Sequence, residues 1–253
     1  MNAFTILFLG FLLGLRHATD ADHVVAVTTI VSKQRKLSSA ALVGITWGIG
    51  HSIMILLVGI AIIIFHVVIP IKIQQLFEFI VSLLLIALGI LNLTGVMQKI
   101  ATAFTPKQKL HTHFHLHDHL HLHVHNHPEN VRESMGRKEE IGDFIRIHGL
   151  FQLVRPFVVG LVHGLAGSAA VALLILGSIK DTTTSLLYLA IFGIGTILGM
   201  MIITTALGIP IIATSKRLVS FDRNITWLSG LVSLIFGSYL AYQIGVVDGL
   251  FTH

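Results

Sequence analysis

The chain of 253 residues contains no cysteine and few charged side chains, and both shortages restrict what it can be. Without cysteine it forms no disulfide framework, thiolate metal site, iron–sulfur cluster or cysteine nucleophile. Charged residues make up 11% of the chain, against about 25% in soluble domains. Hydrophobic residues make up 54%, and the mean hydropathy is +0.85. This composition excludes an ordinary water-soluble enzyme, and also a disordered protein, which needs low hydrophobicity and high charge.

Long apolar segments dominate the chain. A transmembrane helix needs about 20 mainly apolar residues. Six segments come close to this requirement, so we expect an all-α, polytopic membrane protein with six spans. The segments are 4–31, 41–66, 76–97, 153–179, 186–213 and 225–247. The N-terminus lacks a basic region and a cleavage site of small residues, which favours a retained first helix over a signal peptide.

Lysine and arginine are distributed unevenly between the expected connections. With six spans, the first, third and fifth connections share one side of the membrane, and they hold most of the basic residues. The other side holds Lys72 and Lys180, while Arg16 lies inside the first span. The positive-inside rule therefore predicts a protein of the cytoplasmic membrane with both termini outside. The net charge of +5 is spread between apolar runs rather than gathered in a patch, so we expect no nucleic-acid partner.

The two halves of the chain are weakly similar, which predicts two three-helix repeats, 1–98 and 151–253, joined by a flexible loop, 99–150. The matched strings are Gly14-Leu15-Arg16-His17 with Gly160-Leu161-Val162-His163, Gly48-Ile49-Gly50 with Gly193-Ile194-Gly195, and Leu88-Gly89 with Phe236-Gly237. Because each repeat holds three spans, the second enters the membrane from the opposite side. Inverted repeats of this kind are a common plan of transporters, with the binding site near the bilayer midplane.

Glycines recur four residues apart in several spans. The pairs are Gly10/Gly14, Gly44/Gly48, Gly160/Gly164 and Gly195/Gly199. Small residues at this spacing let helix backbones approach closely in lipid, so the pairs predict tight helix packing. A further role is open for Gly14 and Gly164, which could also loosen helices beside a binding site.

Five polar residues interrupt the first span: Arg16, His17, Asp20, Asp22 and His23. A charged side chain at the bilayer centre costs about 2.5–3.5 kcal/mol on insertion scales, so these groups must pair and face the protein interior. Arg16 and Asp20 are four residues apart and can pair on one helix face. Asp22 is then left as an uncompensated anion between two histidines. A carboxylate with neutral imidazoles is a suitable ligand set for a borderline divalent cation.

The geometry of a regular helix complicates such a site. Asp22 lies about 140° from His17 around the helix axis, so one helix cannot aim both residues and His23 at one ion. Either the helix unwinds near residues 18–21, or His17 acts with Asp20 or His23 and with groups from other helices. Two structural explanations also stay open: a hydrogen-bond network between helices, and a position of residues 16–23 at the membrane surface.

Two further histidines lie in predicted spans. His51 follows a glycine pair, and His163 is the repeat counterpart of His17. A single histidine in a membrane helix is often a hydrogen-bonded structural residue. Together with the first-span cluster, however, both are candidate metal ligands, with Ser52 and Ser168 as candidate supporting partners.

The string Arg16-His17-Ala18-Thr19-Asp20-Ala21-Asp22-His23-Val24 resembles the signature of the nickel/cobalt transporter family, R-H-A-x-D-A-D-H-I/V. Gly50-His51-Ser52 resembles the G-H-S element of the same family. The resemblance implies a permease for Ni²⁺ or Co²⁺ with His17, Asp22, His23 and His51 in the metal path. The second half is more similar to the short relatives known as urease-accessory or metal-efflux membrane proteins, which leaves the metal and the direction of transport open.

Every second residue from 111 to 127 is histidine. The nine residues are His111, His113, His115, His117, His119, His121, His123, His125 and His127. An extended chain would place all of them on one face. We interpret this histidine run as a flexible cytoplasmic metal buffer or delivery arm rather than the translocation site. The alternative is low-complexity sequence with incidental metal affinity.

These patterns favour a secondary transporter over an enzyme, because the chain has no nucleotide-binding P-loop and no H-E-x-x-H motif. The expected partners are a divalent transition-metal ion as substrate, the lipid bilayer and a cytoplasmic metallochaperone, with no resident cofactor. Uptake is slightly favoured over efflux, since the matched signature belongs to permeases. The alternatives are a metal-binding accessory or sensor protein without transport and, with less support, an intramembrane metalloenzyme.

Overall fold

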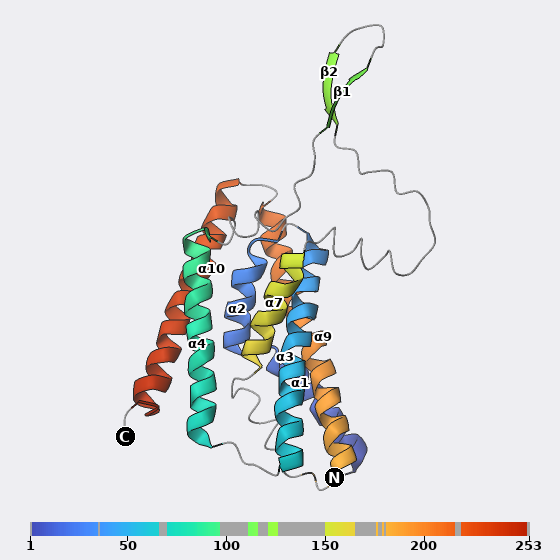
Figure 1. The fold of residues 1–253 in the computed structure, drawn as a ribbon, viewed down its shortest axis with the longest axis vertical. Coiled ribbons are helices and arrows are strands. Elements are labelled where there is room, and N and C mark those ends of the chain that lie inside the picture. Colours follow the sequence, from blue (N-terminus) through green and yellow to red (C-terminus); the bar gives the residue numbers. More distant parts are fainter. Residues whose placement is uncertain are drawn as a thin grey trace.

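The computed structural model describes residues 2–34, 36–65, 70–96, 111–115, 121–125, 150–164, 176, 179, 181–215 and 219–251. These residues form a bundle of α-helices, a short π-helix and a two-stranded hairpin (Figure 1). The elements are α1 (Ala3–His17), α2 (Ala21–Val31), α3 (Leu37–Phe65), α4 (Ile71–Leu93), β1 (His111–His115), β2 (His121–His125), α7 (Leu150–His163), α9 (Thr182–Ser215), α10 (Val219–Tyr242) and η2 (Gln243–Val247). The expected helical membrane protein is confirmed, whereas the hairpin was not predicted.

The first apolar segment is not one helix. Helix α1 ends at His17, α2 begins at Ala21, and the two axes differ by 54°. Asp20 has the extended backbone angles of a residue that precedes a helix, φ −60° and ψ 145°. The hydroxyl of Thr19 donates to the carbonyl of Arg16 at 2.6 Å, which satisfies one of the carbonyls left open at the end of α1. The break therefore lies within the polar cluster and resolves the geometric alternative in favour of an unwound helix.

Four described helices are long and apolar enough to cross a membrane, and the bent pair of α1 and α2 could make a fifth span. The four are α3, α4, α9 and the helical segment Asn224–Val247, which combines α10 with η2. Helix α7 has 14 residues, which is short for a span, and residues 165–175, 177 and 178 of the predicted segment 153–179 lie outside the described residues. The sixth span therefore stays a prediction.

The outer surface of the bundle is apolar. More than half of the surface of Phe4, Leu57, Ile202 and Ile235 is exposed, and these residues come from four different helices. Large exposed apolar side chains on several helices are expected where a protein contacts a partner or lipid. Both chain ends lie at the same end of the bundle, and α4 runs from that end to the opposite one (Figure 1).

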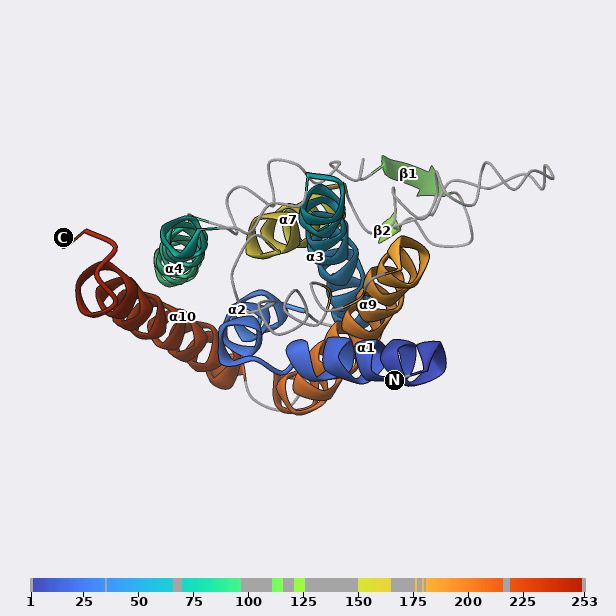
Figure 2. The same cartoon turned by 90° about the horizontal axis from the view of Figure 1, so that it is seen from below.

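Helices α1 and α9, and likewise α3 and α7, are packed backbone against backbone at glycines. A Cβ atom added at Gly14 of α1 would meet the carbonyl oxygen of Phe192 in α9. One added at Gly160 of α7 would meet the carbonyl oxygen of Trp47 in α3. The view along the bundle shows the two pairs, α1 with α9 and α3 with α7, around α2 (Figure 2). The close packing expected from the glycine spacing is present at these positions.

Helices α4 and α10 form a third close interface, which is also fixed by hydrogen bonds. The Asn92 amide donates to the carbonyl of Thr226 at 2.9 Å, and the Ser233 hydroxyl donates to the carbonyl of Leu85 at 2.8 Å. In an apolar environment such bonds give packing its specificity, because an unsatisfied polar group is costly. This pair of helices encloses α2 on the side away from α1 (Figure 2).

Two charged residues lie at helix ends, outside the spans. Asp181 precedes α9, and its carboxylate accepts hydrogen bonds from the backbone N–H and the hydroxyl of Thr184, at 2.8 and 2.6 Å. These bonds lower the pKa of Asp181. Lys33 lies between α2 and α3, where burial, with a further contribution from the charge of Arg155, lowers its pKa to about 8.

The hairpin lies within the histidine run. Strands β1 and β2 are antiparallel, with His111 opposite His125, His113 opposite His123 and His115 opposite His121. Three pairs of histidines therefore occupy opposite positions on the two strands. His117, His119 and His127 lie outside the described residues.

Candidate metal site

The break between α1 and α2 brings together the ionisable residues predicted from the sequence. His17 is the last residue of α1, while Asp22 and His23 lie in the first turn of α2. His51 comes from α3, and His163 is the last residue of α7. The structure thus gathers five candidate ligands from four helices, although they are up to 146 positions apart in the sequence.

One side of the cluster is built around His17. Its Nδ1 atom lies 2.9 Å from a carboxylate oxygen of Asp20, and its Nε2 atom lies 2.8 Å from Nε2 of His51. An ionised carboxylate only accepts hydrogen bonds, so Nδ1 of His17 carries the proton and donates it. Nε2 of a neutral His17 then accepts from Nε2–H of His51. Asp20 is therefore an orienting partner of His17, in the way that carboxylates orient metal-binding histidines.

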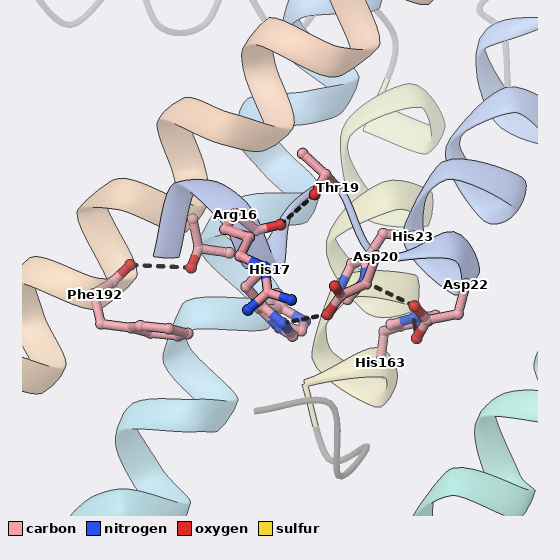
Figure 3. A network of polar contacts seen from close by, with 10 residues as sticks. Arg16, His17, Thr19, Asp20, Asp22, His23, His163 and Phe192 are labelled. Carbon is pink, nitrogen blue, oxygen red and sulfur yellow. Dashed lines mark hydrogen bonds and ion pairs between the residues drawn. The ribbon is translucent and has the colours of Figure 1, made fainter. Parts of the chain in front are cut away.

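The other side of the cluster is built around Asp22. One carboxylate oxygen lies 2.8 Å from Nε2 of His163, and the other lies 3.2 Å from Nδ1 of His23. By the same reasoning, both imidazoles donate to the carboxylate. Figure 3 shows Asp22 and His163 together, separated from His17 by Asp20 and His23.

The imidazoles are enclosed by protein. His23, His51 and His163 have no exposed surface, and His17 is 5% exposed. Each of the first three has one buried ring nitrogen without a hydrogen-bond partner in the described part of the chain: Nε2 of His23, Nδ1 of His51 and Nδ1 of His163. In the tautomers assigned above, these are the nitrogens with a free lone pair. Buried polar atoms are rarely left unsatisfied, and a cation bound beside such a lone pair would satisfy it.

The candidate ligands form two groups that share one residue. The His17 group consists of His17, His23 and His51, and the His163 group of Asp22, His23 and His163. Within each group, the ligand atoms lie within 4.8 Å of one another. The ring centres of His17, His51 and His163 lie 4.7, 4.9 and 4.5 Å from that of His23. His23 is therefore at the centre of the cluster.

Two aromatic side chains surround the imidazoles and were not predicted. Trp47 contacts the rings of His23 and His163, and Phe192 contacts the ring of His17. Both are completely or almost completely buried. An aromatic residue in a membrane span gives no sign of its role by itself. The available signal was the repeat, because Trp47 and Phe192 are separated by the same 145 positions as Gly50 and Gly195.

Several supporting roles predicted from the sequence differ from the structure. Arg16 is exposed, and Asp20 bonds to His17 rather than to Arg16, because the break removes the helical i, i+4 relation between them. The Ser52 hydroxyl donates to the carbonyl of Gly193 at 3.1 Å and thus joins α3 to α9. Ser168 lies outside the described residues.

The fold is that of a membrane protein with several spans, and its interior holds a ligand set suited to divalent transition metals. Residues 3–245 match the NicO family, described as high-affinity nickel-transport protein. The chain belongs to this family. The resemblance inferred from the first-span motif is therefore confirmed, and it extends to nearly the whole chain.

Curated relatives give two further names. The urease accessory protein UreH of Bacillus sp. (strain TB-90) is 35% identical over 251 residues, which are 99% of this chain and 96% of that protein. The chloroplast protein FOR GROWTH AND FERTILITY 1 of Arabidopsis thaliana is 24% identical over 230 residues, which are 90% of this chain and 56% of that protein. No solved structure matches the chain.

Proposed function

We propose that this protein is a secondary transporter that carries Ni²⁺ or Co²⁺ across the cytoplasmic membrane. One observation carries the proposal: imidazoles and a carboxylate are enclosed at a break in an apolar helix, and three ring nitrogens there lack hydrogen-bond partners among the described residues. Broken helices line the substrate sites of many transporters. The proposed ligands are His17, Asp22, His23, His51 and His163.

Six spans arranged as two inverted repeats complete the proposed architecture. The glycine contacts support it, since equivalent glycines meet equivalent carbonyls. Gly195 faces the carbonyl of Phe11, and its counterpart Gly50 faces the carbonyl of Phe157. At the third interface, Gly89 faces Gly230 and Gly237 faces Ser82. Each contact is thus repeated about 145–148 positions along the chain.

The membrane potential provides a driving force for uptake. A potential that is negative inside favours entry of a divalent cation by about 4.6 kcal/mol per 100 mV, twice the value for a single charge. Uptake therefore needs no counter-ion, whereas export would need exchange against protons. With both termini outside, the polar connections that hold the histidine run lie in the cytoplasm, where the run would buffer the metal or deliver it to a metallochaperone.

A second candidate function is metal handling without transport. The printed name of the Bacillus relative, a urease accessory protein, favours a role in supplying nickel to urease. In that case the buried cluster would hold an ion without releasing it to the other side of the membrane. The two functions differ in whether metal crosses a sealed bilayer.

A flux measurement tests the proposal. The full chain is reconstituted in one orientation into sealed vesicles with an imposed potential, and radioactive nickel and cobalt are followed. We expect accumulation that depends on the sign of the potential. Asp22→Asn and His17→Ala should abolish it, because they remove a charge and a ligand from the cluster.

The matched control is Asp181→Asn, since this exposed carboxylate lies outside the cluster and outside the spans. It should transport as the unmodified protein does. Metal binding without flux in the unmodified protein would instead favour the accessory function, and accumulation only against the inward driving force would favour efflux.

A further inference from the structure

The five candidate ligands of the cluster do not form one compact set but two overlapping groups. The His17 group and the His163 group have His23 in common, and each supplies two residues that the other lacks. The ring centres of His51 and His163, one from each group, are 6.3 Å apart. In the described part of the chain, no group of ligand atoms within 4.8 Å of one another contains both His51 and His163.

The two nitrogens of His23 face different surroundings. Nδ1 is directed at the carboxylate of Asp22, at 3.2 Å, whereas Nε2 has no hydrogen-bond partner in the described residues. Asp22 in turn bonds His163, which belongs to the same group. His23 can therefore bind a cation through Nε2 in this tautomer, by a small rotation of the ring toward either group, and through Nδ1 only after the proton has moved from Nδ1 to Nε2.

We infer that the buried cluster is two adjoining cation subsites, the His17 group and the His163 group, between which a single divalent ion is passed through their shared ligand His23. This inference deepens the proposed function and rests on it for the direction of movement, although the two subsites can be tested without flux. Two divalent ions sharing one imidazole would repel strongly in an environment of low dielectric constant, so the subsites are filled one at a time.

The arrangement has a physical advantage for release. An ion in a single site with five protein ligands would have to lose most of them together. Passing between two groups with a common member, it keeps one imidazole while it exchanges the others. The two groups also differ in charge, because Asp22 adds a carboxylate to the His163 group while the His17 group is built from imidazoles alone.

Co²⁺ is the probe for the test, because its visible absorption reports the number and type of its ligands. The measurements use the full chain with the nine histidines of the histidine run changed to asparagine, so that the run contributes no signal. In this background we expect one Co²⁺ per chain. His51→Ala and His163→Ala should each still bind one Co²⁺ in the subsite that remains, with two different spectra, and at least one of the two variants should lose no more than about twofold in affinity.

His23→Ala removes the shared ligand and should weaken binding more than either single change. In vesicles, His51→Ala and His163→Ala should both lose transport while they retain the bound ion. This combination distinguishes two subsites in series from one composite site. His51→Gln and His163→Gln, together with thermal unfolding of every variant, separate loss of a ligand from loss of the fold.

Three outcomes overturn the inference: complete loss of Co²⁺ binding in either His51→Ala or His163→Ala with the fold intact, two ions bound at once in the background protein, or normal flux in either variant. If all proteins bind as expected and even the unmodified chain shows no flux, the subsites stand and the transport function fails. If the unmodified chain transports metal and the Co²⁺ measurements show a single composite site, the transport function stands and the inference of two subsites fails.

Discussion

The two halves of the molecule share a packing framework but not their chemistry. Gly14 of the first half and Gly160 of the second face equivalent backbone carbonyls, of Phe192 and Trp47. The candidate ligands are distributed very differently, with His17, Asp22, His23 and His51 in the first half and only His163 in the second. At the positions of Asp22 and His23, the second half has Ser168 and Ala169.

The glycine contacts present in both halves reflect the packing of helices in lipid, whereas the uneven distribution of candidate ligands reflects what a metal site would require. Helix association in lipid depends on close backbone approach, so both halves need glycine at the contacts. An ion needs only one ligand set, so one copy of the polar motif is sufficient. At the counterpart of His51, Thr196 bonds the carbonyl of Phe192 at 3.0 Å and serves its own helix instead.

The largest effect is expected from breaking the shared framework. Gly14→Ala and Gly160→Ala each place a methyl group against a backbone carbonyl that cannot rotate away. We expect both to destabilise the protein by a similar amount, about 1–3 kcal/mol, as overpacked interiors do. Thermal unfolding in detergent measures the change.

Gly193→Ala is the control, because its added Cβ would meet only the Ser52 side chain, with Cβ at 3.2 Å. It should cost less than either framework change. A large loss for Gly14→Ala with none for Gly160→Ala would show that the halves do not carry equivalent contacts.

A second prediction concerns the connection that belongs to neither half. Deleting residues 111–127 should lower the number of metal ions bound per chain but leave transport measurable, because the buried cluster is unchanged. Equilibrium dialysis with Ni²⁺ and flux into vesicles check the two parts. Complete loss of transport by a deletion protein that inserts normally would place the histidine run in the transport path.

The smallest effect is expected where two basic side chains, one from each half, lie close together. Burial and the charge of Arg155 lower the pKa of Lys33 to about 8, so charged Lys33 destabilises the fold at neutral pH. Lys33→Met should raise the unfolding temperature at pH 7, and the gain should shrink as pH rises above 8 and the native lysine loses its proton. Exposed Lys72→Met should show no such dependence.

The sequence predicted the parts of the fold that the bilayer determines. The expected segment 41–66 corresponds to α3, Leu37–Phe65, and 76–97 to α4, Ile71–Leu93. Long apolar runs leave little choice of structure in lipid, where backbone groups must be satisfied within the helix. Helix ends shift by several residues because polar flanks can extend a helix beyond its apolar part.

The break in the first segment could be stated only as one of two alternatives. The residues Ala18 and Thr19 do not exclude a continuous helix. A tertiary contact distinguishes the two alternatives, since Asp22 bonds His163 from a helix far along the chain, while Asp20 bonds His17 locally across the break. Taken singly, Trp47 and Phe192 could not be distinguished from ordinary core residues, and only their equivalent positions in the repeat marked them.

The three-residue joint at 18–20 has a mechanical consequence. His17 moves with α1, whereas Asp22 and His23 move with α2, and the two helices meet at 54°. A change in that angle would alter the distance from His17 to Asp22 and His23, and with it the affinity for a cation held between them. A force that tilts α1 against α2 would in this way strengthen or weaken metal binding.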